Sequence, residues 1–374
     1  MGLKIIYDAI QISILKLRGF YLLNKAETLS FMSPYLVRYI SGNSISLPQI
    51  LNGEDENHVI FPQKTSDTDE VYIWEYQHPK KNVFFSRYGS LIIKHKVLCT
   101  DWNHNSFLRD IWKKDSRPVL KTPSVIALFS QYQDGVWYGG YYDFVFLVAT
   151  KISRIIDAFP NGNISKMKIS YRLFNAHYET EYLQLLGISP ENLVDSSLNK
   201  VMAPRVITGN SARWHPNLSD ILSLKQNIQK KFQPVKAASK NRIYVSRACR
   251  RKILNEEALI EMLKKFDFQV IEDKPRSVEE QITIYHNASF IIGPHGASFS
   301  NVIWCEPGAH LFELFSHNYA PDFFLYLAAV MDMKYSAYYE EDGERINYVD
   351  ALSEDIYVSI PKLEKCLETL LKVS

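Results

Sequence analysis

The sequence is poor in the residues that bind metals or form disulfides. It has four cysteines in 374 residues, Cys99, Cys249, Cys305 and Cys366, and their spacing matches no metal-binding motif. We expect reduced, mostly buried thiols, which are typical of a reducing compartment. The ten histidines include no H-x-x-x-H or H-E-x-x-H pair, so we predict no zinc site.

Long apolar segments are also absent. The longest apolar run, residues 323–331, is about half of the roughly 20 residues that a membrane-spanning helix needs. The N-terminus has no small-residue cleavage site of a secretory signal. Residues 1–21 have the spacing of an amphipathic helix, with Ile10, Ile14 and Leu17 among its apolar positions. We favour a helix packed on the core, with peripheral membrane contact as the alternative.

Neither sign of charge dominates. Lys and Arg number 43 and Asp and Glu 41, which gives a net charge of +2 and a sequence pI of about 8.1. A protein that coats nucleic acid needs a large basic excess, so we expect no nucleic-acid partner, although a local phosphate site is allowed. The hydrophobic fraction of 46% and the charged fraction of 22% are ordinary for globular proteins and argue against extended disorder.

The C-terminal half alternates apolar runs with amphipathic helical patterns. Strands are predicted at 242–245, 268–271, 289–292 and 311–315, and helices at 256–266, 277–285 and 297–305. Continuous apolar strands between amphipathic helices are typical of a parallel sheet that is covered on both faces. Such α/β domains bind ligands at the carboxyl ends of their strands.

Chain length and one lysine-rich segment indicate the domain boundaries. A chain of 374 residues is long enough for two or three domains. Residues 225–240 carry five lysines, few apolar residues and Pro234, which is typical of an interdomain linker. We therefore predict an N-terminal domain over 1–228, a linker over 229–240, an α/β domain over 241–345 and a C-terminal segment over 346–374 that contains a closing amphipathic helix.

The segment Gly293-Pro294-His295-Gly296-Ala297-Ser298 lies between a predicted strand and a predicted helix. Its glycines allow a close approach of backbone, and the N–H groups and dipole at a helix start suit a phosphate. His295 is suited to donate to a phosphate oxygen or to transfer a proton. The alternative is an ordinary strand-to-helix turn. The segment matches neither G-x-G-x-x-G nor the G-K-[ST] of a P-loop, which disfavours a redox dinucleotide and an ATPase.

Charged side chains accompany two other predicted strands. Ser246 and Arg247 follow the strand 242–245 directly, and Arg251 comes shortly after them. Arginine forks match phosphate oxygens, whereas the alternative is a solvated basic turn. Glu313 is the one charged residue in the strand 311–315. A buried carboxylate must be paired, or at a strand end it can accept hydrogen bonds from ribose hydroxyls.

Acidic residues of the N-terminal half form two further patterns. Asp143 lies between the aromatic segment 138–142 and an apolar run, where restricted solvation can raise a carboxyl pKa and make a base. The alternative is a helix N-cap, which Asp favours. Asp67 and Asp69 have the D-x-D spacing that chelates a divalent metal together with a sugar nucleotide. Because they lie in a polar stretch that we expect to be mobile and to lack a flanking apolar strand, we assign them no metal.

Several short segments between residues 242 and 315 match motifs of one protein family. Each motif alone is weak evidence for a family, but their combination is specific. The segments are Ile243-Tyr244-Val245-Ser246-Arg247, Asn255-Glu256-Glu257, Ser277 to Gln281, Ile292 to Ala297, Asn301, Cys305-Glu306-Pro307-Gly308 and Glu313-Leu314-Phe315. In this order and spacing, over about a fifth of the chain, the region resembles glycosyltransferase family 61. At Tyr141-Tyr142-Asp143-Phe144 many members show an aromatic-His-Trp arrangement, and here Asp143 stands at the His-like position.

The resemblance implies a GT-B fold, in which two Rossmann-like domains face a cleft and the closing C-terminal helix packs back on the first domain. It implies that the C-terminal domain holds a nucleotide-sugar, UDP-linked in most members, and that the N-terminal domain holds an oligosaccharide or lipid-linked glycan acceptor. Members resemble inverting enzymes that need no bound metal or other cofactor. Without a luminal anchor, the chain looks like a bacterial member that builds surface polysaccharide from the cytoplasmic side, with residues 1–21 as a peripheral membrane contact.

The resemblance also implies roles for the candidate residues. Asp143 would take the proton of the attacking hydroxyl, and His295 is the second catalytic candidate. Glu313 would hold the ribose. The nucleotide-sugar would be bound, with its diphosphate stabilised electrostatically, by a larger set that comprises Ser246, Arg247, Arg251, Gly293, His295, Gly296, Ala297 and Ser298 in addition to Glu313.

Three other functions stay open at this point. The first is a phosphohydrolase or phosphotransferase that uses His295, which would release phosphate without a sugar acceptor. The second is a non-catalytic module that binds a nucleotide-sugar or a glycan, which would bind without turnover. The third is a metal-dependent GT-A transferase that uses Asp67 and Asp69, which EDTA would inactivate.

Overall fold

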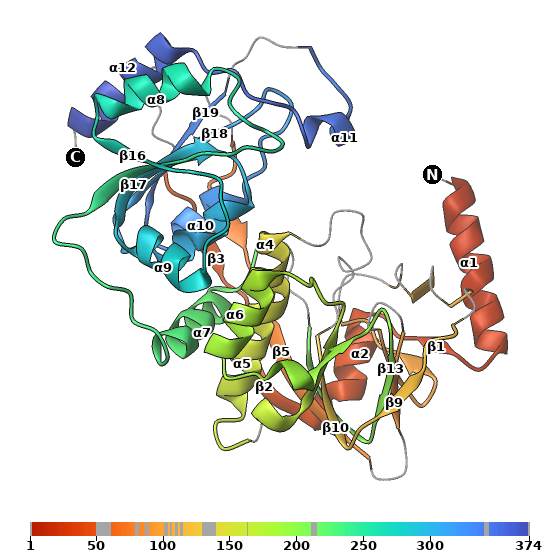
Figure 1. Cartoon of the computed structure of the whole chain (residues 1–374). Coiled ribbons are helices and arrows are strands. Elements are labelled where there is room, and N and C mark those ends of the chain that lie inside the picture. Colours follow the sequence, from red (N-terminus) through yellow and green to blue (C-terminus); the bar gives the residue numbers. More distant parts are fainter. Residues whose placement is uncertain are drawn as a thin grey trace. The chain divides into compact units, whose positions relative to one another are not determined.

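The computed structural model describes residues 2–49, 61–78, 82–86, 90–100, 104, 107–108, 111–112, 115–128, 140–162, 164–210, 215–339 and 344–372. The chain forms two compact units (Figure 1). The first unit comprises Met1–Asn43 and Thr68–Lys231, and the second comprises Ser44–Asp67 and Phe232–Ser374. The predicted α/β class is confirmed, since helices and sheets occur in both units.

The first unit contains two mixed sheets. One has the order β12-β11-β10-β14-β5-β2, in which the first four strands are parallel and the last two run antiparallel to their neighbours. Its strands are β2 (Leu36–Ile40), β5 (Val71–Gln77), β10 (Ser124–Ala127), β11 (Lys168–Tyr171), β12 (Leu193–Asp195) and β14 (Arg205–Gly209). The other has the order β1-β8-β7-β6-β13-β9, built from β1 (Tyr21–Leu22), β6 (Val83–Phe85), β7 (Leu91–Ile93), β8 (Lys96–Val97), β9 (Val119–Lys121) and β13 (Lys200–Ala203).

Helices connect these strands. The N-terminal part has α1 (Gly2–Leu17), α2 (Lys25–Met32) and the 3₁₀ turn η1 (Ser33–Tyr35). Between β10 and β11 the chain forms α4 (Tyr141–Phe144), the π-helical η3 (Val145–Ala149), α5 (Thr150–Ala158) and η4 (Ile164–Lys166). Later segments are α6 (His177–Leu185), η5 (Pro190–Asn192) and α7 (Leu218–Gln229). Within the described part of the chain, no helix combines the length and the apolarity that crossing a membrane requires.

Helix α1 does not bury the face that its spacing predicts. Leu15 is fully buried, but Ile10 and Ile14 are exposed and Leu17 is 89% exposed. Leu15 packs with Phe107 and a few neighbours in a small cluster of its own. The favoured interpretation, a helix packed through its isoleucine face, is therefore wrong for these residues.

The second unit is built on a fully parallel five-stranded sheet with the order β16-β15-β17-β18-β19. Its strands are β15 (Asn241–Val245), β16 (Phe268–Ile271), β17 (Ala288–Pro294), β18 (His310–Leu314) and β19 (Lys334–Tyr338). Helices α8 (Glu256–Lys264) and α12 (Ile360–Lys372) cover one face, and α9 (Val278–His286), η6 (Ala297–Trp304) and α10 (Phe323–Val330) cover the other (Figure 1). The short α11 is Tyr348–Ala351.

The four predicted strands and the parallel sheet are confirmed, but one predicted helix differs in type. The segment 297–304 is a 3₁₀ helix rather than an α-helix. The Ser277 side chain caps α9 by accepting from the backbone N–H of Glu280. Asn255 makes no cap bond, because its side chain instead donates to the carbonyl of Val358 and accepts from the N–H of the same residue.

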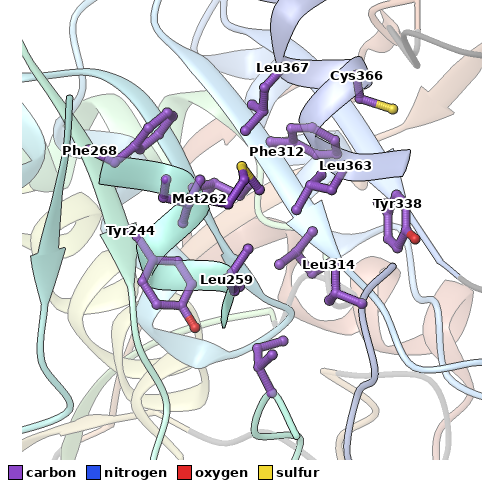
Figure 2. Packing of buried hydrophobic residues seen from close by; sticks show 14 of the residues in the cluster. Tyr244, Leu259, Met262, Phe268, Phe312, Leu314, Tyr338, Leu363, Cys366 and Leu367 are labelled. Carbon is purple, nitrogen blue, oxygen red and sulfur yellow. The ribbon is translucent and has the colours of Figure 1, made fainter. Parts of the chain in front are cut away.

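The closing helix is present, but it packs elsewhere than the resemblance implies. Leu363 and Leu367 of α12 are fully buried in a core with Leu259 of α8 and Phe312 of β18 (Figure 2). The helix therefore completes the core of the second unit, and the expectation that it packs back on the N-terminal domain is wrong. The reason is the apolar stripe of α12, which matches that of its neighbour α8.

The prediction of one continuous N-terminal domain over 1–228 is also wrong. The hairpin β3 (Ser44–Ser46) and β4 (Thr65–Asp67) belongs to the second unit. Phe61 is buried there, with ring centroids 5.9 Å from Phe315 and 6.4 Å from Tyr335, and Gln63 Nε2 donates to Asp322 Oδ2 at 2.9 Å. These contacts hold residues 61–67 to elements that lie far later in the sequence.

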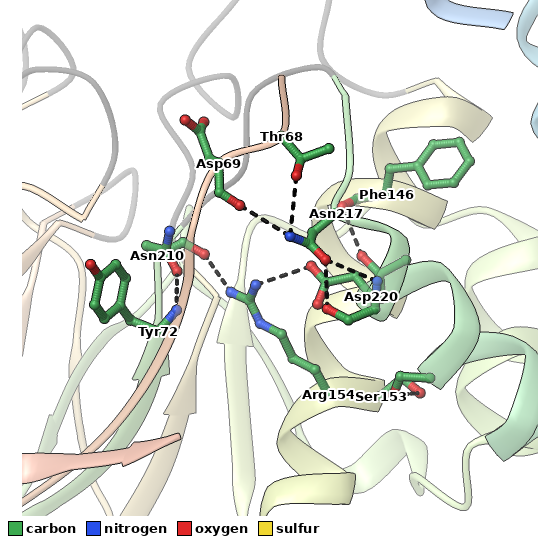
Figure 3. A network of polar contacts seen from close by, with 12 residues as sticks. Thr68, Asp69, Tyr72, Phe146, Ser153, Arg154, Asn210, Asn217 and Asp220 are labelled. Atoms are coloured by element: carbon green, nitrogen blue, oxygen red, sulfur yellow. Dashed lines mark hydrogen bonds and ion pairs between the residues drawn. The ribbon is translucent and has the colours of Figure 1, made fainter. Parts of the chain in front are cut away.

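A buried ion pair joins the helices of the first unit to its sheet (Figure 3). Arg154 of α5 and Asp220 of α7 are almost fully buried and lie 3.0 Å apart, and Arg154 Nη2 also donates to the carbonyl of Asn210. The side chain of Asn210 accepts from Tyr72 N of β5 at 2.8 Å. Burial raises the pKa of Asp220, and Arg154 opposes that shift.

We predict that Arg154→Met lowers the free energy of unfolding by about 3–5 kcal/mol, because it leaves the Asp220 carboxylate buried without its cation. Adding Asp220→Leu should recover most of this loss, since a buried pair replaced by apolar side chains is often nearly neutral. Urea unfolding of the full chain measures both. The exposed Lys166→Met serves as the control, and a cost of Arg154→Met no greater than that of Lys166→Met would contradict the prediction.

Candidate functional site

The strand order of the second unit creates a position for a ligand. In sequence order the sheet reads 2-1-3-4-5, so the chain crosses to one side after β15 and to the other side after β17. Ligands of open α/β sheets bind outside the carboxyl ends of the two strands at this switch point. Ser246 and Arg247 follow β15 there, and residues 293–298 span the end of β17. The structure therefore brings together two of the predicted segments.

Two glycines make this close approach possible. Arg247 Nη1 donates to the carbonyl of His295 at 2.8 Å. A Cβ on Gly296 would lie 1.8 Å from that same nitrogen, and a Cβ on Gly293 would lie 2.6 Å from the carbonyl oxygen of Val245. The glycines are therefore required for space, since a side chain at residue 296 would displace the guanidinium.

His295 belongs to a buried chain of hydrogen bonds. Its Nδ1 lies 2.7 Å from Glu313 Oε1, and the hydroxyl of Tyr335 donates to Glu313 Oε2 at 2.7 Å. The imidazole is stacked on Phe315 at 5.2 Å and packs against Phe324 at 5.1 Å. Glu313 and Tyr335 are fully buried, and His295 is buried except for a small fraction. These contacts fix the plane and the position of the imidazole.

The electrostatics of this chain favour uncharged forms. Burial lowers the pKa of His295 well below its usual value, and the cationic Arg251 and Arg247 lower it further. Burial raises the pKa of Glu313 well above its usual value, opposed by the hydrogen bond from Tyr335 and by Arg251. At neutral pH the imidazole is therefore the neutral form, which can donate or accept one hydrogen bond at Nε2.

Arg251 is held in a position that leaves one donor unused. Its backbone is left-handed, with φ +57°, its Nη1 donates to the carbonyl of Leu352 at 3.1 Å, and its guanidinium lies 5.2 Å from the centre of the Tyr319 ring. The buried Nε finds no acceptor in the described part of the protein. Burial, followed by repulsion from Arg247, lowers the pKa of Arg251 to about 10. A buried cation with an unused donor is suited to an anionic ligand.

Two of the predicted residues, Ser246 and Glu313, have partners within the protein. Ser246 Oγ donates to Glu256 Oε1 at 2.8 Å, and the hydroxyl of Tyr244 donates to the same oxygen. Ala297 and Ser298 begin η6, and Ser298 is exposed. The Glu313 carboxylate is fully buried, and its two oxygens contact His295 Nδ1 and the hydroxyl of Tyr335. It is therefore placed to bind the imidazole rather than a ribose.

Asp143 lies in the first unit, whereas the other candidate residues lie in the second. It is buried at the third position of α4, and its Oδ2 accepts from the N–H of Gly140 at 3.2 Å, so it bonds back to the N-cap residue rather than being the cap. Burial raises the pKa of the neighbouring Tyr178 to about 12, with smaller contributions from Glu179 and Asp143. Tyr138 and Gly139 of the predicted segment lie outside the described residues.

The middle residue of the D-x-D pattern has a structural role. Thr68, between Asp67 and Asp69, is buried, and its hydroxyl accepts from Asn43 N at 2.9 Å and donates to Asn43 O at 3.2 Å. The apolar strand β5 follows at Val71, so the expectation of a polar stretch without a flanking strand is wrong. Among the described residues no group of three or more His, Cys, Asp or Glu side chains could hold a metal ion.

Two residues of the site escaped the sequence analysis. Tyr335 lies on β19, which lacks the long apolar run of the other strands, and Tyr319 lies in a loop before α10. An alternation of polar and apolar residue types in Lys-Tyr-Ser-Ala-Tyr was the one available signal for β19.

We predict that Arg251→Gln raises the pKa of His295, because it removes a cation that disfavours the imidazolium. Titration of ¹⁵N-histidine signals by NMR measures this. His310 is the internal control: burial and Lys334 lower its pKa to about 4, and it should not change in the variant. Both rings of the unaltered chain should remain neutral at pH 6, and a His295 signal titrating at the ordinary value of about 6.5 would contradict the prediction.

Known proteins match this region of the chain. The Glycosyltransferase 61 family model matches residues 175–312, less than half of the chain. An EGF domain-specific O-linked N-acetylglucosamine transferase of Pan troglodytes is 35% identical over 71 residues, 18% of this chain and 14% of the relative, and the protein of that name from Mus musculus gives the same values. The chain thus matches only a small part of these relatives. Residues 175–312 are similar to glycosyltransferase family 61.

Proposed function

We propose that this protein is an inverting, metal-independent glycosyltransferase that moves a sugar from a UDP-sugar to a glycan acceptor. The proposal includes the GT-B arrangement of the two units and a role in bacterial surface polysaccharide synthesis at the cytoplasmic side of the membrane. It rests on the family match over residues 175–312 and on the chemistry of the second unit.

The observation that carries the proposal is the pairing of Arg247 with the end of β17. The guanidinium bonds to the carbonyl of His295 and occupies the space that Gly296 leaves open. Arg251, with its unused buried Nε, belongs to the same charged group, since each arginine lowers the pKa of His295. Two fixed cations at the switch point of a parallel sheet are suited to a nucleoside diphosphate.

The same cations support a mechanism without a metal. In sugar transfer from a nucleotide the bond between the anomeric carbon and the diphosphate oxygen breaks, and negative charge accumulates on the leaving group. Arg247 and Arg251 would stabilise that charge, and because contacts with the protein already hold them, they need little rearrangement during the reaction.

His295 and Glu313 have separate roles in the proposal. The neutral imidazole presents Nε2 to the donor as a hydrogen-bonding group, since Nδ1 is committed to Glu313. Glu313 and Tyr335 act on the donor only through His295 and are therefore positioning residues. This replaces the ribose contact that the resemblance implies for Glu313.

The acceptor hydroxyl needs a base, and we assign that role to Asp143. Its carboxylate is buried beside aromatic residues of the first unit and accepts a backbone hydrogen bond at 3.2 Å from Gly140 N. Attack by the hydroxyl on the anomeric carbon with proton transfer to Asp143 inverts the configuration in one displacement. The relatives named above transfer N-acetylglucosamine, so UDP-N-acetylglucosamine is the first donor to test.

We predict that UDP raises the Tm of the full chain in the presence of EDTA. At 100 times its Kd, UDP should add about 2.7 kcal/mol to the free energy of unfolding, which corresponds to a shift of several degrees. Arg247→Ala should weaken UDP binding by about tenfold or more, since it removes a charge-assisted contact. A shift that requires Mn²⁺ would contradict the metal-independent mechanism.

Arg242→Ala is the matched control for this experiment. Arg242 lies near the amino end of the same strand β15, and its guanidinium bonds to the carbonyl of Phe266. Its loss can lower the Tm itself but should leave the increment produced by UDP unchanged. Equal increments in Arg247→Ala and Arg242→Ala would remove Arg247 from the diphosphate site.

We predict that Asp143→Asn lowers the transfer rate by about 10²–10⁴-fold and spares UDP binding, since the amide cannot accept the acceptor proton. The measurements are sugar transfer to a glycan acceptor and the Tm increment with UDP. Asp157→Asn is the control, because Asp157 bonds to Ser223 and Asn227 on α7. Normal turnover in Asp143→Asn would exclude it as the base. Binding without turnover in the unaltered chain would instead indicate a non-catalytic module.

A further inference from the structure

The first unit contains a pocket that the proposed reaction does not use. It has a volume of about 630 Å³, within the range of sites for small organic ligands. Its lining is largely apolar and includes Phe20, Phe84, Phe85, Ile92, Phe107 and Ile111. An apolar surface of this kind is suited to a hydrocarbon chain and is poorly suited to a sugar or a nucleotide, which need many hydrogen bonds.

A lysine and a histidine border the pocket. Lys94 and His95 form the turn between β7 and β8, both with left-handed backbone (φ +48° and +64°), and both line the pocket. Lys94 is exposed and has no ion pair or hydrogen bond with any residue that the structure describes. This cation is therefore free to meet an anionic group at the pocket margin.

The one acidic residue of the lining is already neutralised. Asp115 lies 2.8 Å from Arg117 Nη2 and 3.4 Å from Lys200 Nζ. The hydrogen bond from Arg117 is the largest cause that lowers the pKa of Asp115, so the carboxylate is charged and paired. The margin of the pocket consequently has a net positive charge, which favours an anion.

Helix α1 suggests where such a ligand comes from. Its exposed side includes the apolar residues Tyr7, Ile10, Ile14 and Leu17, whereas Leu15 on its other side packs in the same cluster as Phe20 and Phe107, which line the pocket. Lys16 and Arg18 lie at the end of the helix. Exposed apolar side chains flanked by basic residues are typical of helices that bind to anionic membrane surfaces.

We propose that this pocket binds the hydrocarbon chain of a membrane lipid phosphate, with the phosphate at Lys94. The apolar lining accounts for the chain, and the exposed Lys94 accounts for the headgroup. Helix α1 packs beside the pocket through Leu15 and has an exposed apolar stripe on its other side, which accounts for access from a membrane surface. The binding is separate from the transfer reaction, because no residue of the proposed donor site lines the pocket.

Decyl phosphate below its critical micelle concentration is the probe, titrated into the full chain by calorimetry. We expect saturable binding with one site per chain. Lys94→Gln should weaken binding of decyl phosphate about fivefold and leave binding of decanol unchanged. Phe84→Asn should weaken both about tenfold, because the side chain, 41% exposed, lines the pocket.

Lys166→Gln and Leu222→Asn are the matched controls, since Lys166 is exposed and Leu222 is 43% exposed, and both lie in the first unit away from the pocket lining. Both should bind decyl phosphate as the unaltered chain does. The proposal is overturned by the absence of saturable binding, by equal effects of Lys94→Gln and Lys166→Gln, or by inorganic phosphate that competes as well as decyl phosphate. Circular dichroism confirms that each variant is folded, and none of these readouts depends on sugar transfer.

Discussion

The candidate site depends on one steric constraint, which is that residue 296 must be a glycine. Because residue 296 has no Cβ, the guanidinium of Arg247 can lie against the backbone at the end of β17 and bond to the carbonyl of His295. This contact joins the loops after two adjacent parallel strands. It fixes a cation at the place where the strand order of the sheet reverses.

Around that contact the protein keeps a set of ionisable groups in an apolar environment. His295, Glu313 and Tyr335 are joined by hydrogen bonds, and Phe315 and Phe324 pack against the imidazole. Such a network is stable only when every member is paired. Arg251 differs, because its buried Nε has no acceptor among the described residues, and an anionic ligand would offset the repulsion between Arg251 and Arg247.

The sequence was most informative where structure is local. Four strands of the second unit follow from short apolar runs and are confirmed. Elements whose place depends on distant partners were not predictable. The strands β3 and β4 pack with a unit encoded after residue 231, and β13 pairs with β6 across more than a hundred residues. The pairing of Glu313 with Tyr335 could not be foreseen, because β19 lacks the apolar pattern that identified its neighbours.

The hairpin of β3 and β4 also bears on the order in which the protein is made. It is synthesised after residues 1–43 of the first unit and before residues 68–231, but the sheet and helices that it packs against come only after residue 231. During synthesis the hairpin therefore has no packing partner until the residues after 231 have been made, while the flanking residues on both sides belong to the first unit. Once Asn43 and Thr68 are fixed in the folded first unit, the chain between them is closed into a loop, so the later docking of β3 and β4 costs little additional chain entropy. The N-terminal part of the chain thus contains, within the sequence of the first unit, a segment that completes the second unit.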